Sequence, residues 1–560
     1  MRNAGITATG IAAALLASIC SHAKVAGDAI TITPVDAANA FLFSPKAPVA
    51  VRFRIASKAD HAVTATLSAE SSSGDVKSEP VAGKVKARDE ATLTFELGKL
   101  AAGFYRMNLM ATHEGKTLYQ ALYPLAVFDR PKQQYKPPLL PIGVYLNGVR
   151  HFEGRSPIYL NTYVHAMAQD IRKRHFNTVV VGEPFGPEQV AIFGQYGLSV
   201  LARTSAENLL GLEPVIGGIL AEDPMAEEVA PLMKKHKALS ATTEKPLMIC
   251  VSGDLAGTKS PQNPMRVWGT IWETLKEGAS SVEEMEPHVR RYWHYYPIEY
   301  GPSYPILQSY VYRGCLSFMD SLQQAGSGLG YLKPLAREKE EEAEEEKPEK
   351  KTGKNNGEKQ IVREYFGQIP FWVKLQAFGT ARAQSVYKIP TPAQLQTMMH
   401  LSLAFGAKGI LLNCYQTDRP GHSGMVDPVS LQPVDGRLAA AGQVARQAMA
   451  QVELLASARY GGGGVMYTNP FAAPVSISTG SKEEDNLTQY VYVINLNTRA
   501  PTSTWLYDLP RVMRDVATGE KLKTEMYETR ESSWWGLFLT LKPGQARILE
   551  KVDLLPTVHE

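Results

Sequence analysis

The sequence predicts an α/β protein in which a (β/α)8 TIM barrel is flanked by an N-terminal and a C-terminal β-sandwich domain. Both ends carry short alternating strand-like segments, and the middle alternates apolar strand-like segments with helical stretches. A chain of 560 residues is also too long for one ordinary domain. We expect a signal peptide at 1–23, an Ig-like β-sandwich at 28–130, the barrel at 139–460 with a charged insertion at 336–360, and a second β-sandwich at 461–560.

The first residues have the pattern of an export signal. A short basic start precedes the apolar run Ile11–Cys20, and Ser21-His22-Ala23 supplies the small residues that a signal peptidase requires. The run is shorter than the roughly 20 residues that span a bilayer, so we expect no membrane span. Lipoprotein anchoring on Cys20 is disfavoured by Ile19, and the predicted location is periplasmic or secreted.

The terminal segments have the period of two that half-buried strands show. VAVRFRIAS and FYRMNLMATH near the start, and QYVYVINLN and GLFLTLKPG near the end, alternate apolar and polar residues. The proline-rich stretch Asp129–Pro141 and the glycine run Gly461–Gly464 separate these regions from the middle. Each region therefore predicts a sandwich of two sheets.

The middle region contains eight apolar segments that predict parallel strands buried on both faces. Helical stretches or irregular connections follow them, and eight such units close a barrel. The segments are Ile142–Gly148, Asn177–Pro184, Leu198–Thr204, Gly217–Pro224, Pro246–Asp254, His288–Ile298, Ile369–Gly379 and Ala407–Gln416. The charged run Glu338–Lys359 lies between the sixth and seventh units and predicts a solvated insertion without a catalytic role.

The composition argues against several classes of partner. The net charge is +3 on 59 basic and 56 acidic residues, so neither a nucleic acid nor an anionic membrane surface is expected. The four cysteines lie far apart and are interpreted as small buried residues. No spacing typical of a metal site, a P-loop or a dinucleotide fold occurs, so no metal and no cofactor are predicted.

Several segments resemble the barrel of β-galactosidase-like (clan A type) glycoside hydrolases, in particular a bacterial branch of that superfamily. PFWVKLQAFG followed by PTPAQLQTMMHLSLAFGAKGILLNCYQ resembles the seventh and eighth units. GGILAEDP resembles the fourth strand with its two acids exchanged, and YYPIEYG resembles the sixth-strand segment. The resemblance covers roughly Pro141–Val552. It implies a glycosidase whose site lies at the carboxyl ends of the strands.

Glycosidases of this kind use two carboxylates, one of which ends the seventh strand. That part of the pattern is missing, because 366–417 contains no acid and Gln376 follows the seventh strand segment. The adjacent pair Glu222 and Asp223, with Glu183 after the second strand, are therefore the catalytic candidates. Two close carboxyls raise one pKa, which suits a general acid. The alternative for Asp223 is a helix cap before Pro224.

Other side chains near the expected strand ends are candidate substrate contacts. Acids and amides hydrogen-bond sugar hydroxyls, and aromatic rings stack on the C–H faces of sugars. These candidates are Asp254, Tyr296, Glu299, Gln376 and Tyr415. Trp534 and Trp535 in the last domain are interpreted as core residues, and the alternative is a binding platform.

The predicted function is that of an exported glycoside hydrolase acting on poly- or oligosaccharides by carboxylate acid/base chemistry. The alternative is a carbohydrate-binding or scaffold protein on a barrel that has lost catalysis, which the missing seventh-strand acid favours. The sequence leaves the sugar, the linkage and the oligomeric state open.

Overall fold

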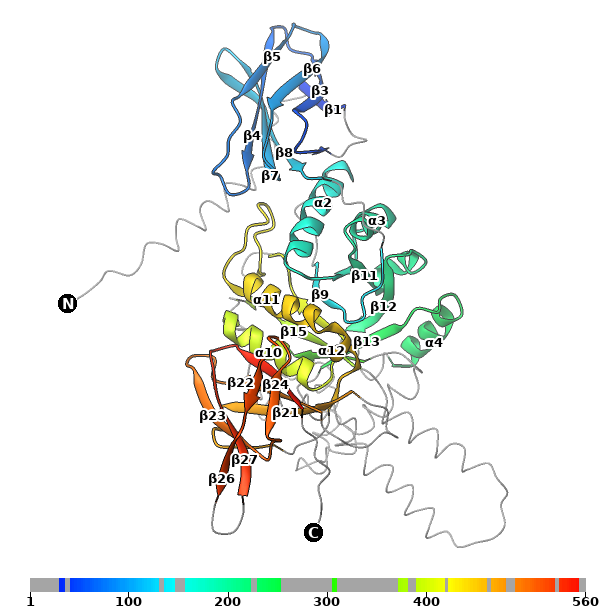
Figure 1. Ribbon diagram of the computed structural model, residues 1–560. Coiled ribbons are helices and arrows are strands. Elements are labelled where there is room, and N and C mark those ends of the chain that lie inside the picture. Colours follow the sequence, from blue (N-terminus) through cyan, green and yellow to red (C-terminus); the bar gives the residue numbers. More distant parts are fainter. Residues whose placement is uncertain are drawn as a thin grey trace, which may run out of the picture. The chain divides into compact units, whose positions relative to one another are not determined.

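The computed structural model (Figure 1) describes residues 30–35, 41–129, 135–146, 157–222, 229–252, 305–309, 371–380, 389–417, 422–460, 465–479, 489–528 and 533–552. The chain divides into two compact units. The first contains the N-terminal sheets, and the second contains a ring of parallel strands with the C-terminal sheets. No helix in the described ranges is both long enough and apolar enough to cross a bilayer.

The N-terminal region forms two sheets. One contains β1 (Ile30–Pro34), β3 (Val49–Ser57) and β6 (Glu90–Gly98), and the other contains β2 (Leu42–Phe43), β8 (Lys116–Val127), β7 (Gly103–His113), β4 (Val63–Ser71) and β5 (Val81–Val85). Along β3 every second side chain is buried, from Val49 to Ser57. This is the alternation that the sequence pattern predicts for a strand with one buried face.

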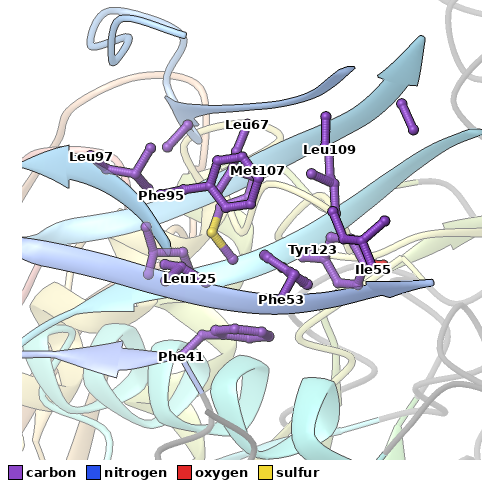
Figure 2. Close-up of a cluster of buried hydrophobic side chains, with 14 of the residues drawn as sticks. Phe41, Phe53, Ile55, Leu67, Phe95, Leu97, Met107, Leu109, Tyr123 and Leu125 are labelled. Carbon is purple, nitrogen blue, oxygen red and sulfur yellow. The ribbon is translucent and has the colours of Figure 1, made fainter. Parts of the chain in front are cut away.

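A single apolar core joins these two sheets, as Figure 2 shows. The ring of Phe53 lies 5.8 Å from that of Phe41, 6.2 Å from Phe95 and 5.1 Å from Tyr123, measured between centroids. Offset and tilted aromatic contacts of this kind stabilise a core beyond the area that they bury. The sheets therefore pack face to face around aromatic residues, while the bounds 28–130 of this domain remain a prediction.

Eight parallel strands form the centre of the second unit, and each pairs with the next until the last pairs with the first. In ring order they are β9 (Ile142–Tyr145), β10 (Thr178–Val181), β11 (Ser199–Arg203), β12 (Val215–Glu222), β13 (Leu247–Ser252), β14 (Pro305–Ser309), β15 (Trp372–Gln376) and β17 (Ile410–Asn413). The mixed α/β class and the parallel strands predicted from the sequence are confirmed by this arrangement.

Helices occupy several of the connections between these strands. They are α2 (Pro157–Lys173), α3 (Pro187–Gln195), the 3-10 helix η4 (Thr204–Leu209), α4 (Val229–Ser240) and α10 (Pro392–Ala404), with α11 (Arg437–Ala450) and α12 (Val452–Ser457) after the last strand. The start of α10 follows from its sequence. Thr391 caps the backbone of Gln394 and Gln394 caps that of Thr391, with Pro392 in the first turn.

The sixth strand differs from its prediction. It is β14, Pro305–Ser309, and it pairs with both β13 and β15. The predicted segment, His288–Ile298, ends before β14 begins and lies outside the described residues, as does the insertion 336–360. Proline is tolerated at the first position of a strand. Because proline usually interrupts strands, PILQS was not predicted as one from the sequence.

The C-terminal region also forms two sheets. One contains β19 (Arg459–Tyr460), β21 (Ala472–Ser478), β22 (Tyr490–Asn495), β28 (Ala546–Lys551), β24 (Val512–Asp515) and β25 (Lys521–Lys523), and the other contains β20 (Met466–Tyr467), β23 (Thr502–Tyr507), β27 (Ser533–Leu541) and β26 (Glu525–Glu528). A core of mainly valine and leucine side chains lies between them.

The larger of these sheets packs against α10 within the second unit. His400 on α10 and the Tyr492 hydroxyl on β22 lie 2.8 Å apart, and the hydroxyl of Thr397 donates to the carbonyl of Asn495. Burial lowers the pKa of His400 to about 4, so this histidine is neutral at ordinary pH. The strand β22 is therefore fixed to the helix that follows β15.

Candidate active site

Polar side chains enter the interior of the ring from β15. Trp372 belongs to the apolar cluster inside the ring. Side chains two residues apart on a strand share a face, so Lys374 and Gln376 point inward as well. Their side chains are almost fully enclosed. A lysine in the middle of an apolar strand is costly unless its charge is paired, so Lys374 requires an anion close to it.

An irregularity in β12 supplies that partner. Ile219 lies beside Met248 and Glu222 beside Cys250, so β12 uses one more residue than β13 over the same length. Ile219, Met248 and Cys250 all belong to the interior cluster, and Glu222 therefore also faces inward. Without the bulge, strict alternation would turn Ala221 inward and Glu222 outward. Bulges of this kind re-aim a side chain and are frequent beside functional sites.

Glu222 is held by two cations. Lys374 Nζ donates to Glu222 Oε2 at 2.6 Å, and Arg203 Nε, at the end of β11, lies 3.2 Å from Oε1. Lys374 Nζ also lies 4.3 Å from the centroid of the Tyr145 ring at the end of β9, which is a cation–π distance. We call Tyr145, Arg203, Glu222 and Lys374 the Glu222 cluster.

The surroundings of Glu222 fix its charge. Burial of the carboxyl acts to raise its pKa, but the charges of Lys374 and Arg203 and the hydrogen bond from Lys374 outweigh burial and hold the pKa below its usual value of 4.5. The Lys374 side chain is 1% exposed and that of Glu222 24% exposed. A ligand at this end of the ring therefore meets a carboxylate whose counter-charge is enclosed below it.

The connections after β15 and β17 pair with each other. β16 (Gly379–Thr380) and β18 (His422–Ser423) form a two-stranded antiparallel sheet. Gln376 Nε2 donates to the carbonyl of Phe378 at 2.8 Å, and the Phe378 ring stacks on His422 with centroids 4.5 Å apart. The carboxyl ends of these two strands are thereby linked beyond the ring itself.

Arg437, the first residue of α11, also links the same two connections. Its guanidinium has no exposed surface and donates to the carbonyls of Ala377 and Gly424, while Nε lies 2.8 Å from a carboxylate oxygen of Asp435. The fixed fork of an arginine can satisfy several acceptors at once. This buried side chain fixes the loops that follow β15 and β17.

The predicted site residues that the structure describes differ in their position relative to the interior of the ring. Glu222 lies in the cluster, and Gln376 points into the ring. Glu183 is exposed in the turn after β10. Tyr415 has no exposed surface, and its hydroxyl donates to Asp170 at 2.6 Å, so we leave it out of the site.

The remaining candidates, Asp223, Asp254, Tyr296 and Glu299, lie outside the described residues. Asp254 follows the end of β13 closely in the chain, as predicted. Glu299 and Tyr296 were expected at the end of the sixth strand, but they precede β14 in the chain, so that placement is wrong.

Three residues of the cluster, Tyr145, Arg203 and Lys374, were not predicted as site residues. Lys374 carried a signal, since a charged residue interrupts the apolar run FWVKLQAF at the position of a buried strand. Arg203 ends the third strand, where polar residues are ordinary. One member of the pair Glu222 and Asp223 was predicted to be a general acid, and the lowered pKa of Glu222 is opposite to the raised pKa that a proton donor needs. Among the described residues, no three His, Cys, Asp or Glu side chains group as metal ligands.

No protein-family model and no curated protein matches the sequence. Among solved structures, the chain is similar to a family 39 glycoside hydrolase from Bacteroides cellulosilyticus WH2, with 13% identity, a TM-score of 0.34, and coverage of 91% of this chain and 99% of the other. A cycloisomaltooligosaccharide glucanotransferase from Paenibacillus sp. gives 8% identity, a TM-score of 0.39, and coverage of 93% and 99%. For a β-glucuronidase from Ruminococcus gnavus the values are 10%, 0.28, 71% and 66%. TM-scores at this level do not establish a shared fold or activity.

The Glu222–Lys374 pair makes a testable contribution to stability. Glu222→Gln leaves the enclosed ammonium with no anion, and we expect it to lower the free energy of unfolding by about 3–5 kcal/mol. Lys374→Met combined with Glu222→Gln removes both charges and should recover much of that loss. Denaturant unfolding of the single and double variants at pH 7 measures the coupling.

The same variants test the charge state. A carboxyl whose pKa is lowered by folding stabilises the protein above its usual pKa of 4.5, and the stabilisation disappears as the pH falls through the lower folded value. The difference between wild type and Glu222→Gln should therefore shrink in acid. Additive effects in the double variant, or a pH-independent difference, would show that the pair is not coupled.

Proposed function

We propose that this chain is a glycoside hydrolase that acts on poly- or oligosaccharides at the carboxyl ends of the ring strands. The observation that carries the proposal is Glu222, an ionised and partly exposed carboxylate turned inward by a bulge. The closed order of eight parallel strands supports a (β/α)8 barrel, in which active sites lie at this end. The sequence resemblance to β-galactosidase-like hydrolases supports the same class.

An ionised carboxylate fits one of the two roles in glycoside hydrolysis. The second carboxylate is the nucleophile in retaining enzymes and the base toward water in inverting ones, and both roles need the anion. The cations around Glu222 keep its carboxyl group ionised at neutral pH. We therefore propose Glu222 for this role and Asp223, Asp254 or Glu183 as the proton donor, since the two carboxyls of glycosidases lie about 5–10 Å apart.

A second function is favoured by a separate observation. Gln376 stands at the end of β15, and the described residues of that strand include no carboxylate. A ring site with one anion locked by two cations could bind a sugar through its hydroxyls without cleaving it. In that case the protein binds carbohydrate on a barrel without hydrolysis.

Turnover on a glycan panel, with product analysis, distinguishes these functions. Glu222→Gln should reduce hydrolysis by a factor of about 10²–10⁴ if the carboxylate attacks or takes a proton in the transition state. Glu453→Gln, on the exposed side of α12, is the matched control and should turn over at the wild-type rate. Because Glu222→Gln also removes a counter-charge, its melting curve is measured beside its rate.

The outcomes separate cleanly. A folded Glu222→Gln variant with wild-type turnover removes Glu222 from catalysis. Retention of a glycan by the wild type with no released reducing ends, on any substrate of the panel, supports the binding function instead.

We also propose that the protein is exported and that residues 1–23 are removed. N-terminal sequencing of the protein recovered from its native host should begin at Lys24. A mature chain that begins at a lipid-modified Cys20 would show a lipoprotein, and an intact Met1 would contradict export by this signal.

A further inference from the structure

The outer face of the four-stranded C-terminal sheet carries aromatic side chains. Leu506 and Leu537 belong to the core between the two C-terminal sheets, and so does Leu539. Alternation along β23 and β27 places Trp505, Tyr507 and Phe538 on the opposite face. Strand pairing then brings them together, because Trp505 lies beside Phe538 and Tyr507 beside Gly536.

The rings of Trp505 and Tyr507 are nearly parallel and stack on each other along β23. Their planes differ by 9°, and their centroids lie 6.2 Å apart. Both rings lie over Gly536, where an added Cβ would stand 3.0 Å from Tyr507 Cδ1 and 3.3 Å from Trp505 Cε3. Phe538 extends the surface, with its centroid 5.3 Å from that of Trp505 and half of its side chain exposed. We call Trp505, Tyr507 and Phe538 the aromatic platform.

Hydroxyl groups and the local charge identify the kind of ligand. Ser503 and Thr540 form the next pair along the same face, and their exposed hydroxyls lie 2.9 Å apart. A pyranose ring offers an apolar C–H face for stacking and hydroxyls for hydrogen bonds beside it. Glu525, the neighbour of Gly536 on β26, is exposed and disfavours an anionic ligand. The face is thus complementary to an uncharged glycan.

Within the second unit, the aromatic platform lies on the face of its sheet that is turned away from the larger C-terminal sheet. The inner face of the sheet packs on the larger sheet, and the larger sheet packs on α10. In Figure 1, β23, β26 and β27 lie on the side of the C-terminal sheets away from α10. We propose that the aromatic platform binds a neutral polysaccharide, at a site separate from the Glu222 cluster. This inference rests on the sheet alone and holds whether or not the ring cleaves glycans.

The test is depletion binding of the full chain to insoluble cellulose, xylan and mannan, with cross-linked polygalacturonate as the anionic comparison. Phe538→Ala removes an exposed ring, and Trp505→Leu removes the ring that stacks on Tyr507 while keeping Gly536 covered. Each should weaken binding to at least one neutral polysaccharide about tenfold or more. Phe471→Ala is the matched control, since Phe471 is equally exposed beside β21 on the other sheet, and it should bind as the wild type does.

Melting curves and sedimentation of the same variants complete the experiment. Phe538→Ala should melt as the wild type does, so lost binding by this variant is a direct effect. The proposal is overturned if no neutral polysaccharide is retained, if the platform variants bind normally, or if polygalacturonate is preferred. It is also overturned if the wild type is an oligomer that Phe538→Ala dissociates, because the platform would then contact a second copy.

Discussion

A lysine ammonium enclosed in a ring of parallel strands needs an anion within reach, and this requirement organises the site. Lys374 has 1% of its side chain exposed, and the carboxylate of Glu222 contacts it at 2.6 Å. The partner lies on β12, and the extra residue in that strand is what turns Glu222 toward the lysine. Arg203 from the neighbouring strand β11 is a second cation beside the same carboxylate, 3.2 Å from Glu222 Oε1. The buried charge of Lys374 therefore depends on the bulge in β12, which directs Glu222 toward it.

The same constraint decides what the carboxylate can do. A proton donor needs a raised pKa, and the cations around Glu222 act in the opposite direction. What the cluster offers is a stable anion, open to a ligand on one side. The counter-charge occupies β15, the strand on which the sequence lacks an acid. The charge of Lys374 thus helps to keep Glu222 ionised.

Much of the fold was predictable because burial leaves a period in the sequence. Alternation marked the strands of the terminal sheets, and continuous apolar runs marked seven of the eight ring strands within a few residues. The exception is β14, which is five residues long and begins with proline. Its sequence is therefore a weaker strand signal than the aromatic segment before it. The bulge at Leu220 was not predictable from the sequence, because one extra residue leaves the apolar run unchanged. It nevertheless moves every later side chain of the strand to the opposite face of the sheet. For the same reason the sequence identified Glu222 as a candidate but not its partner, and Lys374 lay 152 positions away.

The charge state of Glu222 is the central claim, and infrared spectroscopy measures it directly. The difference between wild-type and Glu222→Gln spectra isolates the bands of this carboxyl group as the pH is lowered. The account predicts a carboxylate band that persists below pH 4.5 and that gives way to a protonated band at higher pH in Lys374→Met. A protonated Glu222 at neutral pH in the wild type would contradict it.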